Sequence, residues 1–230
     1  MRLKPSNSLI EYTLKRSGRK TIGISVERDG SVVVSAPEIV TEEAVKQHVQ
    51  NKRLWIWEKQ AIKKHQNSEA PQKQFITGES FEYLGRRYRM KLIDAQDKPL
   101  KMHEGWFCLS RDYQSEAKKS FIGWYSIRLE EKINERLKHV FGFKKENLPS
   151  IRVIDLGYRW GSCSKEGILN FNWKIAMAPL SIIDYVIAHE LTHLQEHSHS
   201  ERFWKELGKI MPGYQKKKEW LKNNGMTLSL

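Results

Sequence analysis

The chain has 230 residues and a formal net charge of +13, with 40 Lys and Arg side chains against 27 Asp and Glu. A chain of this length can bury a substantial hydrophobic core. Its two cysteines, Cys108 and Cys163, are too few for a disulfide scaffold. No apolar run is long enough for a signal peptide or a transmembrane helix, so we expect a cytoplasmic protein with no membrane partner. The positive charge favours polyanions such as nucleic acid, and a scattered basic surface is the alternative.

Strands and a long helix are predicted before a polar connector, KHQNSEAPQKQ. Residues 9–36 alternate apolar and polar side chains around turn signals at Gly18 and Gly30, which predicts antiparallel strands. From Thr41 to His65 the pattern predicts one helix, with acids in its first turn and bases in its last. The connector divides the chain into an expected β-hairpin and helix module, residues 1–66, and a second domain, residues 75–230.

The second domain opens with strand-like runs in residues 75–109 and a turn at Gly85, which predict more antiparallel sheet. Residues 115–141 predict an amphipathic helix whose apolar side chains recur every four positions. These side chains are Phe121, Tyr125, Leu129, Ile133 and Leu137. Two strand-like segments, IRVIDLGYRWGSCS and GILNFNWKIAMAP, follow and are joined by a turn near residues 165–167.

Another helix is expected from Ser181, where Ser181 and Asp184 resemble a capping box. The side chains of Ile183, Ile187, Leu191 and Leu194 form an apolar stripe along it.

The same helix carries the sequence HELTH, in which His189 and His193 are four residues apart and so share one face. This is the H-E-x-x-H pattern, whose histidines bind zinc and whose glutamate, here Glu190, activates water. The alternative is two partly buried histidines with ordinary hydrogen bonds. We favour zinc because the helix is otherwise apolar, and ionisable groups are costly to bury without a partner or a metal.

A third ligand should follow in the sequence LQEHSHSERFW. His197 lies roughly 12 Å along a straight helix from His189, too far to share one ion. His199 is six residues beyond His193, an offset at which the chain can leave the helix and fold an imidazole back. We therefore favour His199. His197 and the acids Glu201 and Glu206 remain alternatives, and no glycine helps the chain to turn.

Three protein ligands would leave one position for water, which is typical of a catalytic zinc. We expect one Zn²⁺ per chain and peptide hydrolysis, with Glu190 accepting a proton from water and passing it to the leaving amine. Histidine ligands also accept other first-row metals. They bind only when neutral, so metal affinity should fall in acid.

Three motifs together, RWGSCS, HELTH and HSERFW, resemble the YgjP-like metallopeptidases, zincins related to the SprT-like and WLM proteases. The resemblance extends over nearly the whole chain. It implies an α+β, zincin-like fold in which an antiparallel sheet packs against the active-site helix. It also implies that the third ligand is the histidine of an Asn-His-Ser element, which selects His199, with Ser198 standing in place of the usual asparagine.

A substrate cleft between this helix and an edge strand is a further implication of the resemblance. Extended peptides bind such edges by strand addition, and residues 159–164 and 169–173 are both candidates for the edge. Trp160, Gly161, Ser162 and Cys163 either contact substrate or serve as turn and packing residues. Catalysis by Cys163 with a histidine base is a disfavoured alternative, because metal spacing already explains the histidines.

The aromatic residues that follow His199 could serve in catalysis or in packing. Tyr214 could donate a hydrogen bond to the oxyanion of the reaction, or simply pack its ring on the core. Phe203 and Trp204 are expected to anchor the turn that carries His199.

The leading function is thus a zinc-dependent metalloprotease acting on a protein or peptide substrate. The alternative is a basic nucleic-acid-associated protein with a structural or regulatory zinc site, suggested by KRLWIWEKQAIKK and YQKKKEWLKNN. The two functions could combine in a protease acting on DNA-bound proteins, because the SprT-like and WLM relatives are associated with removing proteins from DNA. The sequence assigns no oligomeric state.

Overall fold

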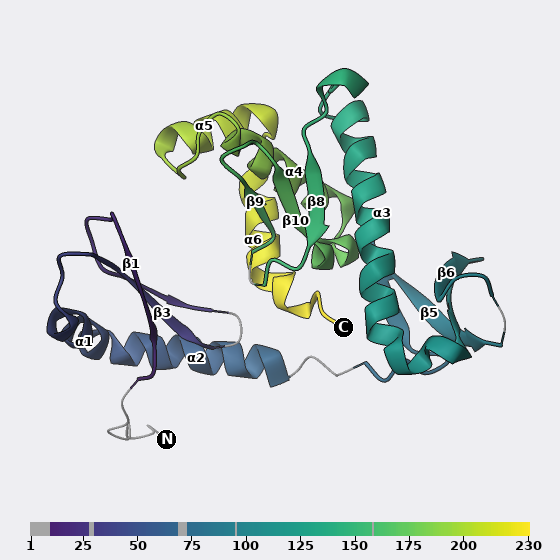
Figure 1. The fold of residues 1–230 in the computed structure, drawn as a ribbon, viewed down its shortest axis with the longest axis horizontal. Helices are drawn as coiled ribbons and strands as arrows, with labels where there is room; N and C mark the ends of the chain where they lie inside the picture. Colours follow the sequence, from purple (N-terminus) through teal and green to yellow (C-terminus); the bar gives the residue numbers. More distant parts are fainter. Residues whose placement is uncertain (1–9, 28–29, 69–72, 95, 158) are drawn as a thin grey trace. The chain divides into compact units, whose positions relative to one another are not determined.

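The computed structural model describes residues 10–27, 30–68, 73–94, 96–157 and 159–230. The chain forms two compact units, Met1–Pro71 and Gln72–Leu230, shown in Figure 1. Each unit has its own hydrophobic core. The fold is α+β, as expected, and none of the described helices is long and apolar enough to cross a membrane. The narrower expectation of two domains, 1–66 and 75–230, stays a prediction.

A three-stranded sheet forms one layer of the first unit. Its strands are β1 (Thr13–Ser17), β2 (Gly23–Val26) and β3 (Val32–Pro37), in the order β1-β3-β2. The β2–β3 hairpin is antiparallel, but β1 runs parallel to β3, so the prediction of purely antiparallel strands was wrong. Placing β1 on the second edge of β3 makes the most buried strand the central one.

Two helices form the other layer where one was predicted, α1 (Glu42–Asn51) and α2 (Arg53–Ser68). The Thr41 hydroxyl caps α1 by accepting the Ala44 N–H, at 3.3 Å. Lys52 leaves helical geometry, and this break lets both helices bury side chains in one core. The buried members of this core are Ile10, Val32, Val34, Ala36, Val45, Val49 and Ile56.

The second unit begins with a four-stranded sheet in the order β4-β5-β7-β6. Its strands are β4 (Ser80–Tyr83), β5 (Arg86–Ile93), β6 (Leu100–His103) and β7 (Trp106–Ser110). The turn at Gly85 is confirmed, with φ +76°. The two hairpins are antiparallel, but β5 and β7 pair in parallel at the centre, so the all-antiparallel prediction was wrong here too.

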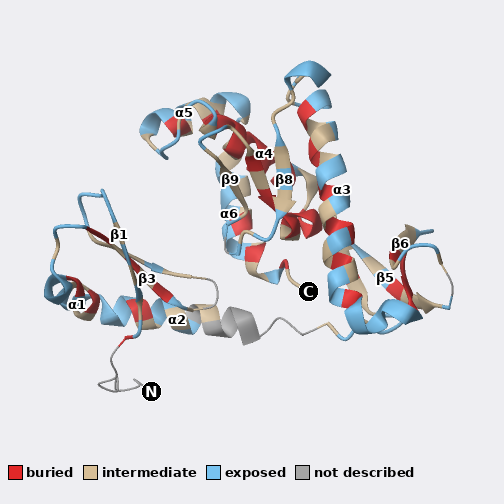
Figure 2. Ribbon diagram, viewed as in Figure 1, coloured by how far each residue is buried: buried red, intermediate tan, exposed pale blue. Residues whose placement is uncertain are grey.

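The predicted amphipathic helix is confirmed as α3 (Ala117–His139), and all five of its expected apolar side chains are buried. The helix lies beside both sheets of this unit (Figure 1), and its buried residues face them (Figure 2). The Tyr125 hydroxyl donates to the Glu82 carbonyl at 2.6 Å, which ties α3 to β4. α3 therefore joins the two sheets into one core.

The second sheet of this unit consists of β8 (Ile151–Ile154), β9 (Gly161–Cys163) and β10 (Leu169–Asn172), in the order β8-β10-β9. The segment 151–164 was expected to be one strand, but a turn at Gly157, with φ +60°, divides it. β8 then pairs with β10 in parallel, while β9 pairs with β10 antiparallel through the predicted turn at 165–167. Residues 173–177 form a 3-10 helix and not the predicted strand.

Three helices complete the unit, α4 (Leu180–His193), α5 (Glu201–Ile210) and α6 (Tyr214–Asn224). The predicted capping box is absent, because α4 starts after Pro179 and no side chain caps it. Asp184 instead pairs with Arg136 of α3 through two hydrogen bonds of 2.7 Å. α4 is buried on nearly all sides (Figure 2), although Leu194, expected in its stripe, is 38% exposed.

Candidate metal centre

The last turns of α4 carry His189, Glu190 and His193, and a third imidazole reaches them from the loop before α5. Donor atoms of His189, His193 and His199 all lie within 4.8 Å of one another. The Nε2 atoms of His189 and His199 are 2.9 Å apart. This is the distance of a hydrogen bond between the two rings, and it also brings both nitrogens within reach of one ion.

The loop between α4 and α5 turns without glycine. The His193 Nδ1 atom lies 3.0 Å from the Glu196 carbonyl oxygen, and the Ser198 hydroxyl donates to the Glu196 side chain at 2.8 Å. The Ser200 hydroxyl then caps α5. Polar contacts thus replace the missing glycine and direct His199 back toward α4.

The alternative ligands from the sequence do not join this group within the part of the chain that the structure describes. His197 is exposed and lines the neighbouring cavity, while Glu201 and Glu206 belong to α5. The carboxylate of Glu206 pairs with Lys209.

Two contacts orient the imidazoles. A carbonyl oxygen only accepts hydrogen bonds, so the Glu196 carbonyl places the His193 proton on Nδ1 and leaves Nε2 free for a metal. Phe203 is fully buried, with its ring centroid 4.6 to 4.9 Å from those of all three histidines. The ring of Trp204 stacks on His199 at 5.5 Å. Both aromatic residues thus contact the imidazoles directly, as well as packing against the core.

Burial strongly shifts the pKa values of the side chains at this site. It lowers the pKa of His189 to about 3, with smaller effects from His193 and His199. It also lowers the pKa of His199 and raises that of Glu190 to about 8. The imidazole that is most buried is therefore neutral, the form that binds a metal.

Two buried polar atoms at this site have no hydrogen-bond partner in the structure, the His189 Nδ1 and the Glu190 Oε2. Such atoms are costly unless something else satisfies them. A four-coordinate zinc with bonds of about 2.05 Å needs ligand nitrogens roughly 3.3 Å apart, a distance between the 2.9 Å that separates the His189 and His199 Nε2 atoms and the 4.8 Å within which the whole group lies. The orphaned carboxylate oxygen of Glu190 thus fits a water on a zinc held by the three imidazoles, whereas a zinc on His189 Nε2 would leave Nδ1 without a partner.

A cavity of about 860 Å³ opens onto this group. Its lining contains all four residues proposed for substrate contact, Trp160, Gly161, Ser162 and Cys163. They lie on or beside β9, which is an edge strand, whereas β10 is the central strand of its sheet. Of the two candidate edges, the structure thus favours residues 159–164.

Gly161 is where β9 meets the carboxyl of Glu190. A Cβ atom on Gly161 would overlap Glu190 Oε1 and lie 2.7 Å from Glu190 Cδ. Close approach, and not a special backbone angle, is thus the reason for glycine here.

Two of the expected polar groups are placed unfavourably for chemistry. The ring of Tyr214 stacks on Trp204 at 5.6 Å, and this tyrosine lies outside the described lining of the cavity. Burial raises the pKa of the Cys163 thiol, and the charge of Glu190 raises it further, so the thiol stays protonated at neutral pH. A protonated thiol is a poor nucleophile.

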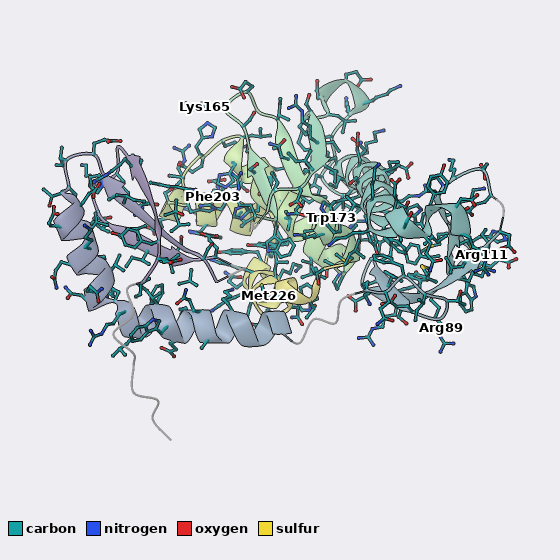
Figure 3. The ribbon with its side chains drawn as sticks, turned by 60° about the horizontal axis from the view of Figure 1, so that its bottom comes forward. Arg89, Arg111, Lys165, Trp173, Phe203 and Met226 are labelled. Carbon is teal, nitrogen blue, oxygen red and sulfur yellow. The ribbon has the colours of Figure 1, made fainter. Side chains whose placement is uncertain are left out.

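Sequence reasoning missed Tyr185 and Lys165, which line the cavity together with Arg159, the first residue of the candidate edge 159–164. Tyr185 precedes His189 by one helical turn, so the spacing alone placed it on the same face. The side chains of Arg159 and Lys165 are exposed at the two ends of β9. Figure 3 shows Lys165 at the outer end of its turn and Phe203 within the unit.

Among known proteins, one family model matches most of the chain. The model of a family described as "YgjP-like, metallopeptidase domain" matches residues 20–224. No curated protein matches the chain. Among solved structures, the metallopeptidase zymogen of Pyrococcus abyssi abylysin is similar at 23% identity, with 42% of this chain and 93% of that chain covered and a TM-score of 0.35. That of Methanocaldococcus jannaschii jannalysin is similar at 20% identity, with 42% and 94% covered and a TM-score of 0.33.

Proposed function

Because the chain belongs to the YgjP-like metallopeptidase family, we propose that it is a zinc protease in which His189, His193 and His199 hold the metal and Glu190 is the general base. The convergence of three imidazoles and a buried carboxyl group at one cavity carries this proposal. We expect one zinc ion per chain.

The chemistry divides between the metal and the chain. When bound, zinc supplies a Lewis acid that lowers the pKa of a water and polarises a substrate carbonyl. Glu190 accepts a proton from the attacking water and later delivers it to the leaving amine. Burial alone would keep Glu190 protonated at neutral pH, and a divalent cation beside it would lower its pKa, so that Glu190 could act as a base in its carboxylate form.

The substrate pairs with the edge of β9 that no described strand covers, where main-chain groups can form hydrogen bonds to an extended peptide. Tyr185 is the better placed of the two tyrosines to donate a hydrogen bond to the developing oxyanion, because it lines the cavity and Tyr214 does not. Its pKa, raised to about 12 by burial, keeps the hydroxyl protonated as a donor needs.

The test combines metal content with peptidase activity in the purified full chain. Elemental analysis should find about one zinc in wild type and in Glu190→Gln, while Glu190→Gln should lose hydrolysis. His199→Ala should lose the metal, and the matched control His197→Ala should keep it. Full hydrolysis by zinc-loaded Glu190→Gln would refute the role of Glu190, and failure of wild type to bind zinc would refute the whole proposal.

A further inference from the structure

We propose that the cleft beside β9 selects acidic protein segments, with one acidic substrate side chain on each side of the cleaved bond. This inference deepens the proposed protease function and rests on it. The observation that carries it is the placement of Arg159 and Lys165 at opposite ends of the edge strand, both in the lining of the metal-site cavity.

The described lining of the cavity is poor in negative charge. Arg159 and Lys165 are basic side chains of this lining, whereas Glu190 is the single acid among its described residues. Neither cation belongs to an ion pair within the described residues, unlike Arg87, Arg111 or Arg128 elsewhere in this unit. The charge of Arg159 does lower the pKa of Glu190, but no carboxylate among the described residues lies within ion-pair distance of either cation, so both can still pair with a substrate.

Nearby charges do not cancel these two cations. Glu166 follows Lys165 in the turn, but it lies outside the described lining and its carboxylate accepts a hydrogen bond from Ser164. Lys218 adds a third cation next to the metal group, with its Nζ 3.8 Å from the centre of the Trp204 ring that stacks on His199. The cleft therefore attracts anionic groups before any metal is bound, and a zinc ion adds to this attraction.

Strand geometry says where the anionic groups must lie. A substrate paired with residues 161–163 runs along β9 and passes Arg159 at one end and Lys165 at the other. The carboxyl group of Glu190 lies against Gly161, between these two ends. The reacting bond is thus flanked by a cation on each side, which fits acidic side chains on both sides of that bond.

Peptidase assays on the zinc-loaded full chain test this with peptides that share one sequence around the cleaved bond. Flanking pairs of Glu, Gln or Lys provide acidic, neutral and basic versions. Since each exposed ion pair contributes about a two- to fivefold effect, kcat/KM should fall in the order acidic, neutral, basic. The ratio of acidic to neutral should shrink as salt is raised.

Variants assign the preference to particular side chains. Lys165→Glu should reduce the ratio of kcat/KM for the acidic peptide to kcat/KM for the neutral peptide by at least about twofold, the smaller effect of one exposed ion pair. Lys138→Gln removes an exposed lysine of α3 outside the cleft and should leave the ratio unchanged. Equal cleavage of acidic and neutral peptides by wild type would overturn the proposal, as would an unchanged ratio in Lys165→Glu.

Binding separates this proposal from the protease function. Zinc-loaded Glu190→Gln should bind the labelled acidic peptide more tightly than the neutral one in fluorescence polarisation. Preferential binding of the acidic peptide without cleavage by wild type would refute the protease function and support the selection of acidic segments. Cleavage by wild type without preference for the acidic peptide would support the protease function and refute that selection. If single-stranded DNA of matched charge bound in the cleft and the acidic peptide did not, nucleic acid would be the ligand and the proposal would fail.

Discussion

Replacing Glu190 with glutamine should stabilise the metal-free protein at neutral pH. Burial raises the pKa of Glu190 from its ordinary value of 4.5 to about 8, so the folded protein holds a proton that the unfolded chain releases. The Glu190 contribution to the stability of wild type is therefore lost as pH rises from about 4.5 to about 8, while a glutamine cannot ionise. At pH 7 the unfolded carboxyl is 2.5 pH units above its pKa, which at about 1.36 kcal/mol per unit gives a difference of about 3 kcal/mol.

The assay is urea denaturation of both proteins in chelator at several pH values. The stability advantage of Glu190→Gln should grow from under about 1 kcal/mol at pH 5 to about 3 kcal/mol at pH 7. Zinc should shrink it, because a neighbouring cation favours the carboxylate. Glu104→Gln is the matched control, since this side chain is 77% exposed. An advantage that did not change with pH, or that decreased as pH rose, would refute the reasoning.

Three further outcomes are expected. Gly161→Ala should keep zinc and lose at least about tenfold in kcat, because the new Cβ displaces the Glu190 carboxyl; unchanged kcat would contradict this. Trp204→Leu should weaken zinc binding by about tenfold in chelator competition, because His199 loses the ring that holds it, and an unaltered affinity would count against the stack. In the metal-free protein the contribution of His189 to stability should be lost as pH falls from 6.5 toward 3, because burial keeps this imidazole neutral while the unfolded chain takes up its proton; the stability of His189→Phe relative to wild type should therefore rise over this range.

Local features of the sequence determined the parts of the protein that depend on neighbours a few residues apart. The four-residue repeat of apolar side chains predicted α3, and the glycine at position 85 predicted a turn. The i, i+4 spacing placed His189 and His193 on one helical face. Helix periodicity and backbone sterics act within a turn or two of chain, so such features can be read without knowing the fold.

Contacts between distant segments were decided only by tertiary structure. The parallel pairing of β1 with β3, β5 with β7 and β8 with β10 was missed, because strand direction depends on which edges remain free once the core has formed. Asp184 reads locally as a helix cap, yet it pairs with Arg136, 48 residues away. Spacing left His199, His197 and two acids open as the third ligand, and the loop after α4 decides which of them approaches His189. The cations at the two ends of β9 became a feature of the cleft only when that strand proved to be the sheet edge beside α4, a position set by packing rather than by local sequence.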